Sequence, residues 1–234
     1  MHCDEAIILA GGLGTRLQPV LKDRPKPMAP IGGQPFLAYL LRYLSAFNIR
    51  HIVLSVGFRH SLIKSHFGNA HYGIDLTYAI EDEPLGTGGA IRYALNYIQG
   101  DLVFILNGDT FFNVNLKDLE TFYYRHDADL VMAVRQMHGI RRYGIVKMKG
   151  SAVTGFSAAE KATMGYINGG IYIMKPSLLG RFELPGSFSF ESGFLERTIK
   201  ELRIYALKCS DYFIDIGIPE DYEKARRELP YLFP

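Results

Sequence analysis

The sequence predicts an α/β fold in which a doubly wound, mostly parallel mixed sheet carries helices on both faces. Residues 6–10 form an unbroken apolar run of strand length, typical of a strand buried on both faces. A glycine-rich segment at 11–14 follows that run directly. Further apolar strands then alternate with amphipathic helical segments up to about residue 106. This alternation is typical of parallel strands covered by helices.

The elements of the first half follow from periodicity and turn residues. The sequence predicts strands at 51–56, 74–80 and 102–106. Leucines at helical spacing predict a helix that begins at Gln34 and Pro35, and Gly68 ends a second helix around 61–67. A second glycine-rich loop, 81–89, opens a helix that runs through Tyr97.

From Asp127 onward the sequence predicts short strands joined by turns, at 130–134, 144–148, 152–156, 166–174, 203–207 and 212–215. A mixed sheet with antiparallel pairs is the expected arrangement, forming a lid over one side of the molecule. The Asn168-Gly169-Gly170 interruption indicates a bulge or the close approach of a ligand. A last helix is expected after Gly217, with proline and two acidic residues in its first turn.

Composition excludes several classes of function. The chain is 48% hydrophobic and 21% charged, and its formal net charge of +2 gives no basic face for nucleic acid. No apolar run approaches the ~18 residues of a membrane span, and residues 1–5 lack the basic start of a signal peptide. We therefore expect a cytoplasmic protein with no membrane segment. The two cysteines and seven histidines form no ligand cluster. The composition is compatible with a homo-oligomer.

The segment after the first strand predicts a cradle for phosphate groups. Because Gly11, Gly12 and Gly14 have no Cβ, the backbone there can take positive φ values and point its N–H groups at an anion. Arg16 and Lys26 add two positive charges. The residues fit neither a Walker A loop nor a dinucleotide fingerprint. The expected site lies at the carboxyl edge of the sheet, where open α/β folds bind ligands.

Two carboxylates are candidate metal ligands. Asp109 follows the buried strand 102–106, which places it at the same edge, although Asn-Gly-Asp is also good turn chemistry. Asp215 stands among Phe213, Ile214 and Ile216, so it needs a cation or an ion pair with Lys or Arg. Mg²⁺ binds one or two carboxylates together with substrate phosphates.

The glycine run, the Thr-Arg-Leu that follows it and the Pro-Lys-Pro at 25–27 resemble the signature of the sugar-1-phosphate nucleotidyltransferases. The resemblance covers nearly the whole chain. It implies one domain over residues 1–234, in which 1–126 mainly bind the nucleotide and 127–234 mainly bind the sugar phosphate. It also implies a nucleoside triphosphate site at Leu9, Gly11, Gly12, Gly14, Thr15, Arg16, Lys26, Glu81, Leu85, Gly86 and Thr87.

The same resemblance implies the remaining roles. Mg²⁺ is expected at Asp109 and Asp215, and catalysis is expected from Arg16, Lys26 and Asp109. A sugar 1-phosphate oxygen, already anionic near neutral pH, attacks the α-phosphorus and releases pyrophosphate without a general base. The sugar-phosphate site is expected at Gly108, Gly144, Glu160, Lys161 and Asn168.

Three stretches, 20–30, 81–89 and 106–112, are most similar to guanylyltransferases that join GTP to D-glycero-α-D-manno-heptose 1-phosphate for bacterial surface polysaccharide. The alternatives are a uridylyl- or thymidylyltransferase acting on a hexose 1-phosphate, and a nucleotide-sugar sensor that has lost the chemistry. Intact Arg16, Lys26, Asp109 and Asp215 argue against the sensor. No residue in the sequence selects guanine on physical grounds.

Overall fold

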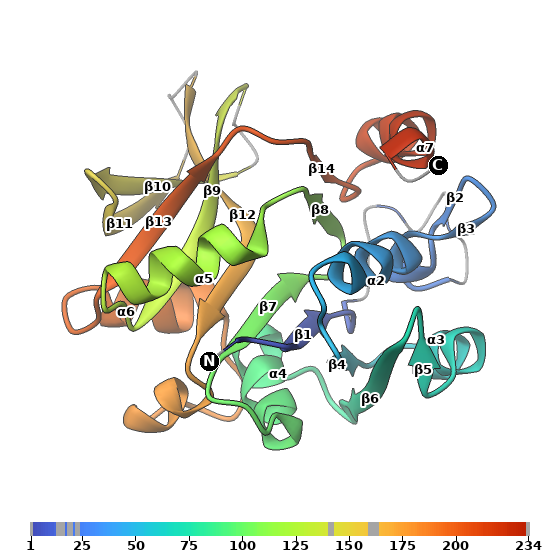
Figure 1. Ribbon diagram of the computed structural model, residues 1–234, viewed down its shortest axis with the longest axis horizontal. Coiled ribbons are helices and arrows are strands. Elements are labelled where there is room, and N and C mark those ends of the chain that lie inside the picture. Colours follow the sequence, from blue (N-terminus) through green and yellow to red (C-terminus); the bar gives the residue numbers. More distant parts are fainter. Residues whose placement is uncertain are drawn as a thin grey trace.

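The computed structural model describes residues 2–12, 17, 21, 24–139, 143–158 and 164–232. Within these ranges, a ten-stranded sheet runs through both halves of the chain in the order β10-β11-β13-β9-β12-β7-β1-β4-β6-β5 (Figure 1). Its central strands β7, β1, β4 and β6 are parallel. The predicted α/β fold with a mostly parallel core is therefore confirmed. These strands are Glu5–Leu9 (β1), His51–Val56 (β4), Ile74–Ile80 (β6) and Val103–Asn107 (β7).

Helices cover both faces of the sheet because alternate residues of the central strands point to opposite sides. Ile8 of β1 packs in one apolar cluster with α2 (Phe36–Ala46), α3 (His60–Phe67) and α5 (Leu116–Arg125). Its neighbour Ile7 packs on the other face with α4 (Gly86–Ala94). Both isoleucines are fully buried. The continuous apolar run of the first strand thus reflects burial on both faces, as predicted.

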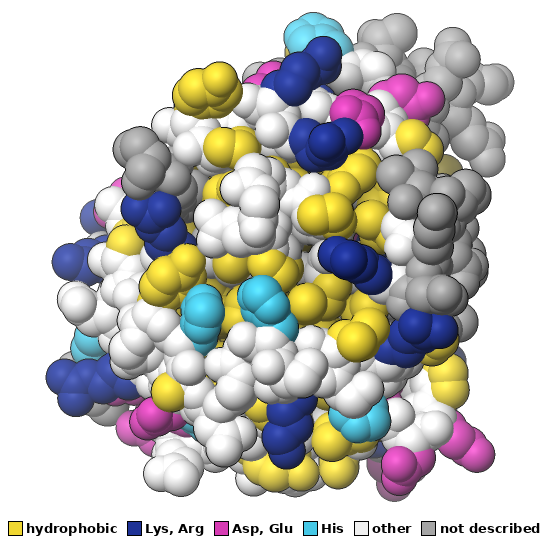
Figure 2. Space-filling model, turned by 90° about the vertical axis from the view of Figure 1, so that its right-hand side faces the viewer, with side chains coloured by type: hydrophobic (Ala, Val, Ile, Leu, Met, Phe, Trp, Pro, Cys, Tyr) yellow, Lys and Arg dark blue, Asp and Glu magenta, His cyan; other side chains and the backbone are white. Residues whose placement is uncertain are grey.

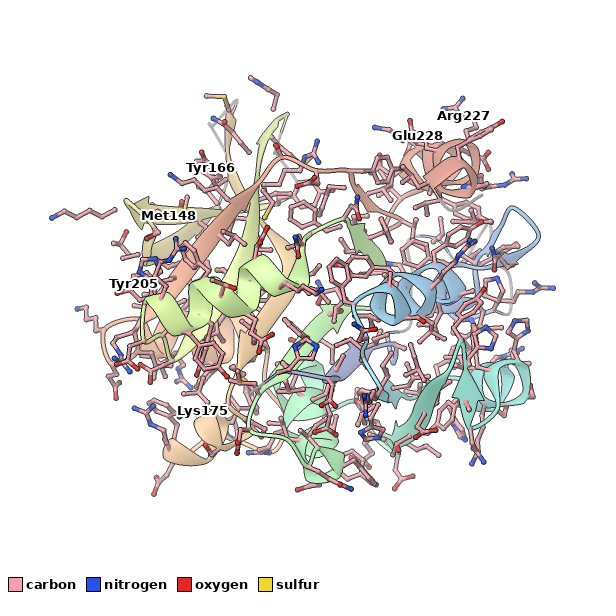
Figure 3. The ribbon with its side chains drawn as sticks, viewed as in Figure 1. Met148, Tyr166, Lys175, Tyr205, Arg227 and Glu228 are labelled. Atoms are coloured by element: carbon pink, nitrogen blue, oxygen red, sulfur yellow. The ribbon has the colours of Figure 1, made fainter. Side chains whose placement is uncertain are left out.

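The second half of the chain extends the sheet mostly through antiparallel pairs, although residues 204–209 pair parallel with residues 130–135. β12 (Met164–Met174) pairs antiparallel with both β7 and β9 (Leu130–His138), and so joins the extension to the parallel core. The other strands of the extension are β10 (Gly144–Lys149), β11 (Ala152–Ala158) and β13 (Ile204–Cys209). Met148, Tyr166 and Tyr205 lie on three different strands of this extension (Figure 3).

Strand β12 contains the bulge that its glycines indicated. Its register against β9 shifts between Asn168 and Tyr172, and Gly170 adopts a φ of +72°. A Cβ on Gly169 would lie 2.4 Å from the ring of Phe112, and one on Gly170 would lie 2.7 Å from Asn107. Close packing against Phe112 and Asn107 is therefore sufficient to explain both glycines.

Several short elements differ from the expectations. Helix α5 was not predicted, although Asn115 caps it by accepting a hydrogen bond from the Lys117 amide (3.0 Å). Helix α2 begins at Phe36, because Gln34–Pro35 form strand β3 with β2 (Pro30–Ile31). The remaining elements are β5 (Ala70–His71), β8 (Thr110–Phe112), β14 (Phe213–Asp215), α6 (Glu196–Thr198), α7 (Pro219–Leu232), the π-helix η4 (Phe190–Leu195) and the 3-10 turns η1 (Lys26–Met28), η2 (Leu95–Tyr97) and η3 (Pro176–Arg181).

Helix α7 closes one end of the molecule. It lies beside β2 and β3 (Figure 1), and the Tyr222 hydroxyl donates to the Pro30 carbonyl (2.8 Å). The surface at the same side shows hydrophobic side chains near its middle with Lys, Arg and His among them (Figure 2). Among the described residues, every helix is too short or too polar to cross a membrane.

The contact between the ends of β1 and β7 predicts the effect of a substitution at Gly108. A Cβ there would lie 2.4 Å from the Leu9 carbonyl oxygen, a backbone atom in the middle of the sheet. We expect Gly108→Ala to lower the free energy of unfolding by about 1 to 3 kcal/mol, the usual cost of overpacking. Urea denaturation measures this change. Gly12→Ala is the control, because nothing lies within 4 Å of a Cβ at Gly12; equal midpoints for both variants would contradict the prediction.

Candidate active site

A cleft of about 760 Å³ lies at the carboxyl ends of the parallel strands. Its position is the one at which open α/β sheets bind ligands, and its size suits a nucleotide. Residues from the first loop, the second glycine-rich loop and the end of β7 meet in it. The cleft is lined by Leu9, Ala10, Gly11, Gly12, Lys26, Pro27, Ser55, Gly57, Phe58, Glu81, Asp82, Glu83, Pro84, Gly86, Thr87, Ala90, Asn107, Gly108 and Asp109.

The cleft has a polar floor built at the carboxyl ends of adjacent strands. Ser55 of β4 and Asn107 of β7 flank Leu9 of β1 in register. Glu81 follows β6, and its amide donates to the Val56 carbonyl (2.8 Å), which continues the row to the next strand. The sequence analysis did not single out Ser55 or Asn107. Ser55 is the penultimate residue of β4 and Asn107 the last residue of β7, and a polar residue at such a position in a largely apolar strand is the signal that could have found them.

The Glu81 carboxylate is fixed at one end of this row. The fully buried Ser55 hydroxyl donates to Oε1 (2.7 Å), and the Leu85 amide donates to Oε2 (3.2 Å). Each oxygen therefore holds one internal hydrogen bond and can accept another. Glu81 is half-buried and lines the cleft, so the carboxylate is a rigid acceptor for donors on a bound ligand.

The first glycine loop differs from the expected conformation. Gly11 and Gly12 line the cleft, but neither has a φ in the left-handed region. Gly11 is instead required by space, because a Cβ there would lie 3.0 Å from Glu81 Oε1 and 3.3 Å from the Gly57 amide nitrogen. The remainder of the predicted cradle, Gly14, Thr15 and Arg16, lies outside the described residues.

The second glycine loop is shaped by an aromatic side chain from the other half of the chain. Gly86 has a φ of +67°, and a Cβ on Gly88 would lie 2.1 Å from the ring of Phe188. The Gly88 amide donates to the Phe188 carbonyl (2.9 Å), and the Phe190 amide donates to the Thr87 hydroxyl (2.8 Å). Gly86 and Thr87 line the cleft, so these contacts also fix one of its walls.

Lys26 and Asp109 form an ion pair at the opposite end of the cleft. The Lys26 Nζ lies 2.8 Å from Asp109 Oδ2, and the two side chains are 16% and 36% exposed. Lys26 is held there by the 3-10 turn η1, which follows Pro25. The ion pair joins one of the expected phosphate-binding cations to one of the expected metal ligands, although the two residues are 83 positions apart in the sequence.

Asp215 lies next to Asp109 through the pairing of β14 with β8. Asp215 is opposite Thr110, and the Ile216 amide donates to the Asp109 carbonyl (2.9 Å). Asp215 Oδ1 accepts a hydrogen bond from the Gly217 amide (2.7 Å). Within the described ranges, no group of three or more His, Cys, Asp or Glu side chains could hold a metal by itself. Two carboxylates do fit Mg²⁺ that takes its other ligands from phosphate and water.

The expected sugar-phosphate residues are spread along the neighbouring strands. Gly108 lines the cleft, and Asn168 lies on β12, the strand next to β7. Gly144 begins β10, opposite Ala158, in the antiparallel extension. Glu160 and Lys161 lie outside the described residues.

Neither of the two cysteine thiols is a reactive nucleophile. Burial raises the pKa of Cys3 to about 12 and that of Cys209 to about 11. Both thiols are therefore protonated near neutral pH, and it is the thiolate that reacts.

A parallel sheet whose carboxyl edge carries a glycine loop, a lysine and a carboxylate defines an α/β nucleotide-binding enzyme. The family model for the nucleotidyl transferases matches residues 5–230, so the chain belongs to that family. It is 44% identical over 227 residues to the D-glycero-alpha-D-manno-heptose 1-phosphate guanylyltransferase of Aneurinibacillus thermoaerophilus, covering 97% of this chain and 99% of that one. The enzyme of that name from Campylobacter jejuni is 42% identical, with coverages of 93% and 96%.

The fold is shared with solved structures of related proteins. HddC from Yersinia pseudotuberculosis superposes with a TM-score of 0.87 at 35% identity, covering 98% of this chain and all of that one. Its complex with GMP-PN gives a TM-score of 0.86. A UDP-glucose pyrophosphorylase complexed with UDP-glucose is 18% identical with a TM-score of 0.82, which shows the fold alone. The resemblance read from the sequence is thus confirmed at the level of the family.

The adjacent Asp109 and Asp215 predict a divalent metal site. We expect Asp109→Asn to weaken Mn²⁺ binding at least tenfold, on the order of the 10- to 100-fold losses seen when metal-site partners are removed. Titration of Mn²⁺ in the presence of a non-hydrolysable nucleoside triphosphate measures this affinity. Asp82→Asn removes one charge from the other end of the same cleft and serves as the control. Equal losses in the two variants would show a general charge effect and contradict the site.

Proposed function

We propose that this protein is a guanylyltransferase that joins GTP and D-glycero-α-D-manno-heptose 1-phosphate, giving GDP-heptose and pyrophosphate. The observation that carries the proposal is the 44% identity to the guanylyltransferase of that specificity, which extends over 99% of its length. A product of this kind serves bacterial surface polysaccharide, in capsule or lipopolysaccharide. The cytoplasm is the proposed setting, because GTP is available there.

The proposed reaction is an in-line displacement. An oxygen of the sugar 1-phosphate forms a bond to the α-phosphorus of GTP, and the bond from that phosphorus to the bridging oxygen breaks as pyrophosphate leaves. Charge accumulates on phosphoryl oxygens in such a transfer, so fixed cations and backbone donors supply most of the catalysis. Lys26 and Arg16 are the proposed cations, and Gly11 and Gly12 the proposed backbone donors. Mg²⁺ at Asp109 and Asp215 would neutralise further phosphate charge.

The Glu81 carboxylate supports guanine as the base. Guanine presents two adjacent donors, N1–H and N2–H, and a carboxylate can accept from both. Uracil and thymine present one N–H donor between two carbonyl acceptors, which a carboxylate pairs with poorly. Glu81 is held by Ser55 and Leu85 with one acceptor site left on each oxygen. A site with fixed acceptors rejects a base that leaves them unpaired.

A substrate panel tests this function. Purified protein with Mg²⁺ is given GTP, ATP, UTP or dTTP together with heptose-, mannose- or glucose-1-phosphate, and pyrophosphate release is measured. We expect the highest kcat/KM with GTP and the heptose 1-phosphate. Equal or higher turnover with UTP or dTTP and a hexose 1-phosphate would replace the proposal by a uridylyl- or thymidylyltransferase. No pyrophosphate release with any pair would favour a sensor without catalysis.

A substitution at Glu81 tests the basis of guanine selection. We expect Glu81→Gln to lower kcat/KM for GTP by roughly 10- to 100-fold, since hydrogen bonds to a charged group contribute about 1.5–3 kcal/mol. The loss with UTP is expected to be smaller, so the ratio of the two kcat/KM values falls. Glu83→Gln, a nearby exposed carboxylate that also lines the cleft, is the matched control. An unchanged ratio in the Glu81 variant would contradict this role.

A further inference from the structure

We propose that Glu191 binds hydroxyl groups of the sugar substrate, with Asn168 and Tyr172 as the residues that position it. This inference rests on the proposed transferase function and adds a residue that sequence reasoning did not single out. Three observations lead to it: the place of Asn168 on the strand beside the floor of the cleft, the use of its amide within the protein, and the open oxygen of Glu191.

Asn168 continues the polar row across the sheet. β12 is the next strand after β7, where Asn107 ends the row that lines the cleft. Gly170 lies directly against Asn107, since a Cβ on it would be 2.7 Å from the Asn107 Nδ2. Asn168 is two residues away from this contact. The row thus runs from Glu81 at one end to Asn168 at the other.

The amide of Asn168 is fully used inside the protein. Its Oδ1 accepts from the Gly170 amide (3.1 Å), and its Nδ2 donates to the Tyr172 hydroxyl and to Glu191 Oε1, each at 2.5 Å. An amide nitrogen has two hydrogens to donate. Asn168 therefore has no donor left for a sugar, and its role is to hold Glu191.

Tyr172 holds the same carboxylate oxygen from inside the core. Its hydroxyl donates to Glu191 Oε1 (3.1 Å), and its ring is 1% exposed. Burial and the nearby Glu191 raise the pKa of Tyr172 well above its ordinary value, so it remains a donor. Two donors thus fix Oε1, while Oε2 accepts from none of the described residues and the side chain is exposed.

The segment that carries Glu191 is attached to the wall of the cleft. The Phe190 amide donates to the Thr87 hydroxyl (2.8 Å), and Thr87 lines the cleft. A role for Glu191 in capping this π-helix is not needed, because the Ser189 hydroxyl already accepts from the Ser192 amide (3.3 Å). A carboxylate fixed beside the cleft repels phosphate and accepts hydrogen bonds from hydroxyls. Its ligand is therefore the polyol part of the sugar rather than its phosphate.

The test compares variants in steady-state kinetics. We expect Glu191→Gln to lower kcat/KM for the sugar 1-phosphate by roughly 10- to 100-fold, as expected for hydrogen bonds to a charged acceptor, with KM for GTP within about twofold of the unchanged protein. Glu196→Gln, an exposed carboxylate five positions later in the same helical stretch, is the matched control. Deoxy analogues of the sugar then locate the hydroxyl, because the effect of Glu191→Gln should vanish with the analogue that lacks it.

Two results would overturn the inference. An unchanged KM for the sugar in Glu191→Gln and Glu191→Ala would show that the carboxylate makes no contact with it. Equal losses for GTP and for the sugar, together with a lower melting temperature, would show a structural role instead. In both cases the unchanged protein still turns over, so the proposed transferase function stands. If the unchanged protein releases no pyrophosphate with any sugar phosphate, the proposed function and this inference both fail.

Discussion

The site depends on the close backbone contact between the ends of β1 and β7. The Gly108 amide donates to the Leu9 carbonyl (2.9 Å), and only a residue without Cβ allows this approach. The contact brings the chain after β7 back over the first loop, so Asp109 reaches Lys26. It also starts β8, whose pairing with β14 delivers Asp215 to the same place. Segments more than 100 residues apart in the chain therefore meet because two parallel strands share one carboxyl edge.

The sequence predicted those parts of the fold in which local pattern and burial agree. Strand β6 has the predicted bounds, 74–80, because β-branched and apolar residues there alternate and pair with β4. Helix α5 was missed because most of its residues are polar and only Leu116, Leu119, Glu120 and Tyr123 are buried. For the site, the glycines predicted where loops lie, but they did not predict which side chains pack against them. Gly88 is needed because the ring of Phe188, 100 residues later in the chain, occupies the space of a Cβ. Pairings of this kind are set by tertiary packing, which periodicity does not encode.

Charge along the polar row changes in a way that matches a nucleotide sugar. Fixed carboxylates, Glu81 and Glu191, stand at the two ends, each held by two donors from the protein. Lys26 and the glycine loop line the same cleft, and the phosphates of the proposed substrates belong beside them. Donors on the base and hydroxyls on the sugar suit the two carboxylates, whereas phosphate suits Lys26 and the backbone amides. Because each carboxylate is fixed before binding, little ordering is required when the substrate arrives.

The two ends of the row are also joined mechanically. The loop that follows Glu81 contains Leu85 and Thr87. Hydrogen bonds connect this loop to the segment that leads to Glu191. The Phe188 amide donates to the Leu85 carbonyl (3.0 Å), and the Phe190 amide donates to the Thr87 hydroxyl. The half-buried Glu81, which accepts from the Leu85 amide, and the exposed Glu191, which follows Phe190, therefore belong to one packed unit around Phe188. Since packed units shift as a whole rather than deforming locally, the distance between the two carboxylates is fixed by this packing. The same packing thus sets the length of substrate that can contact both ends at once.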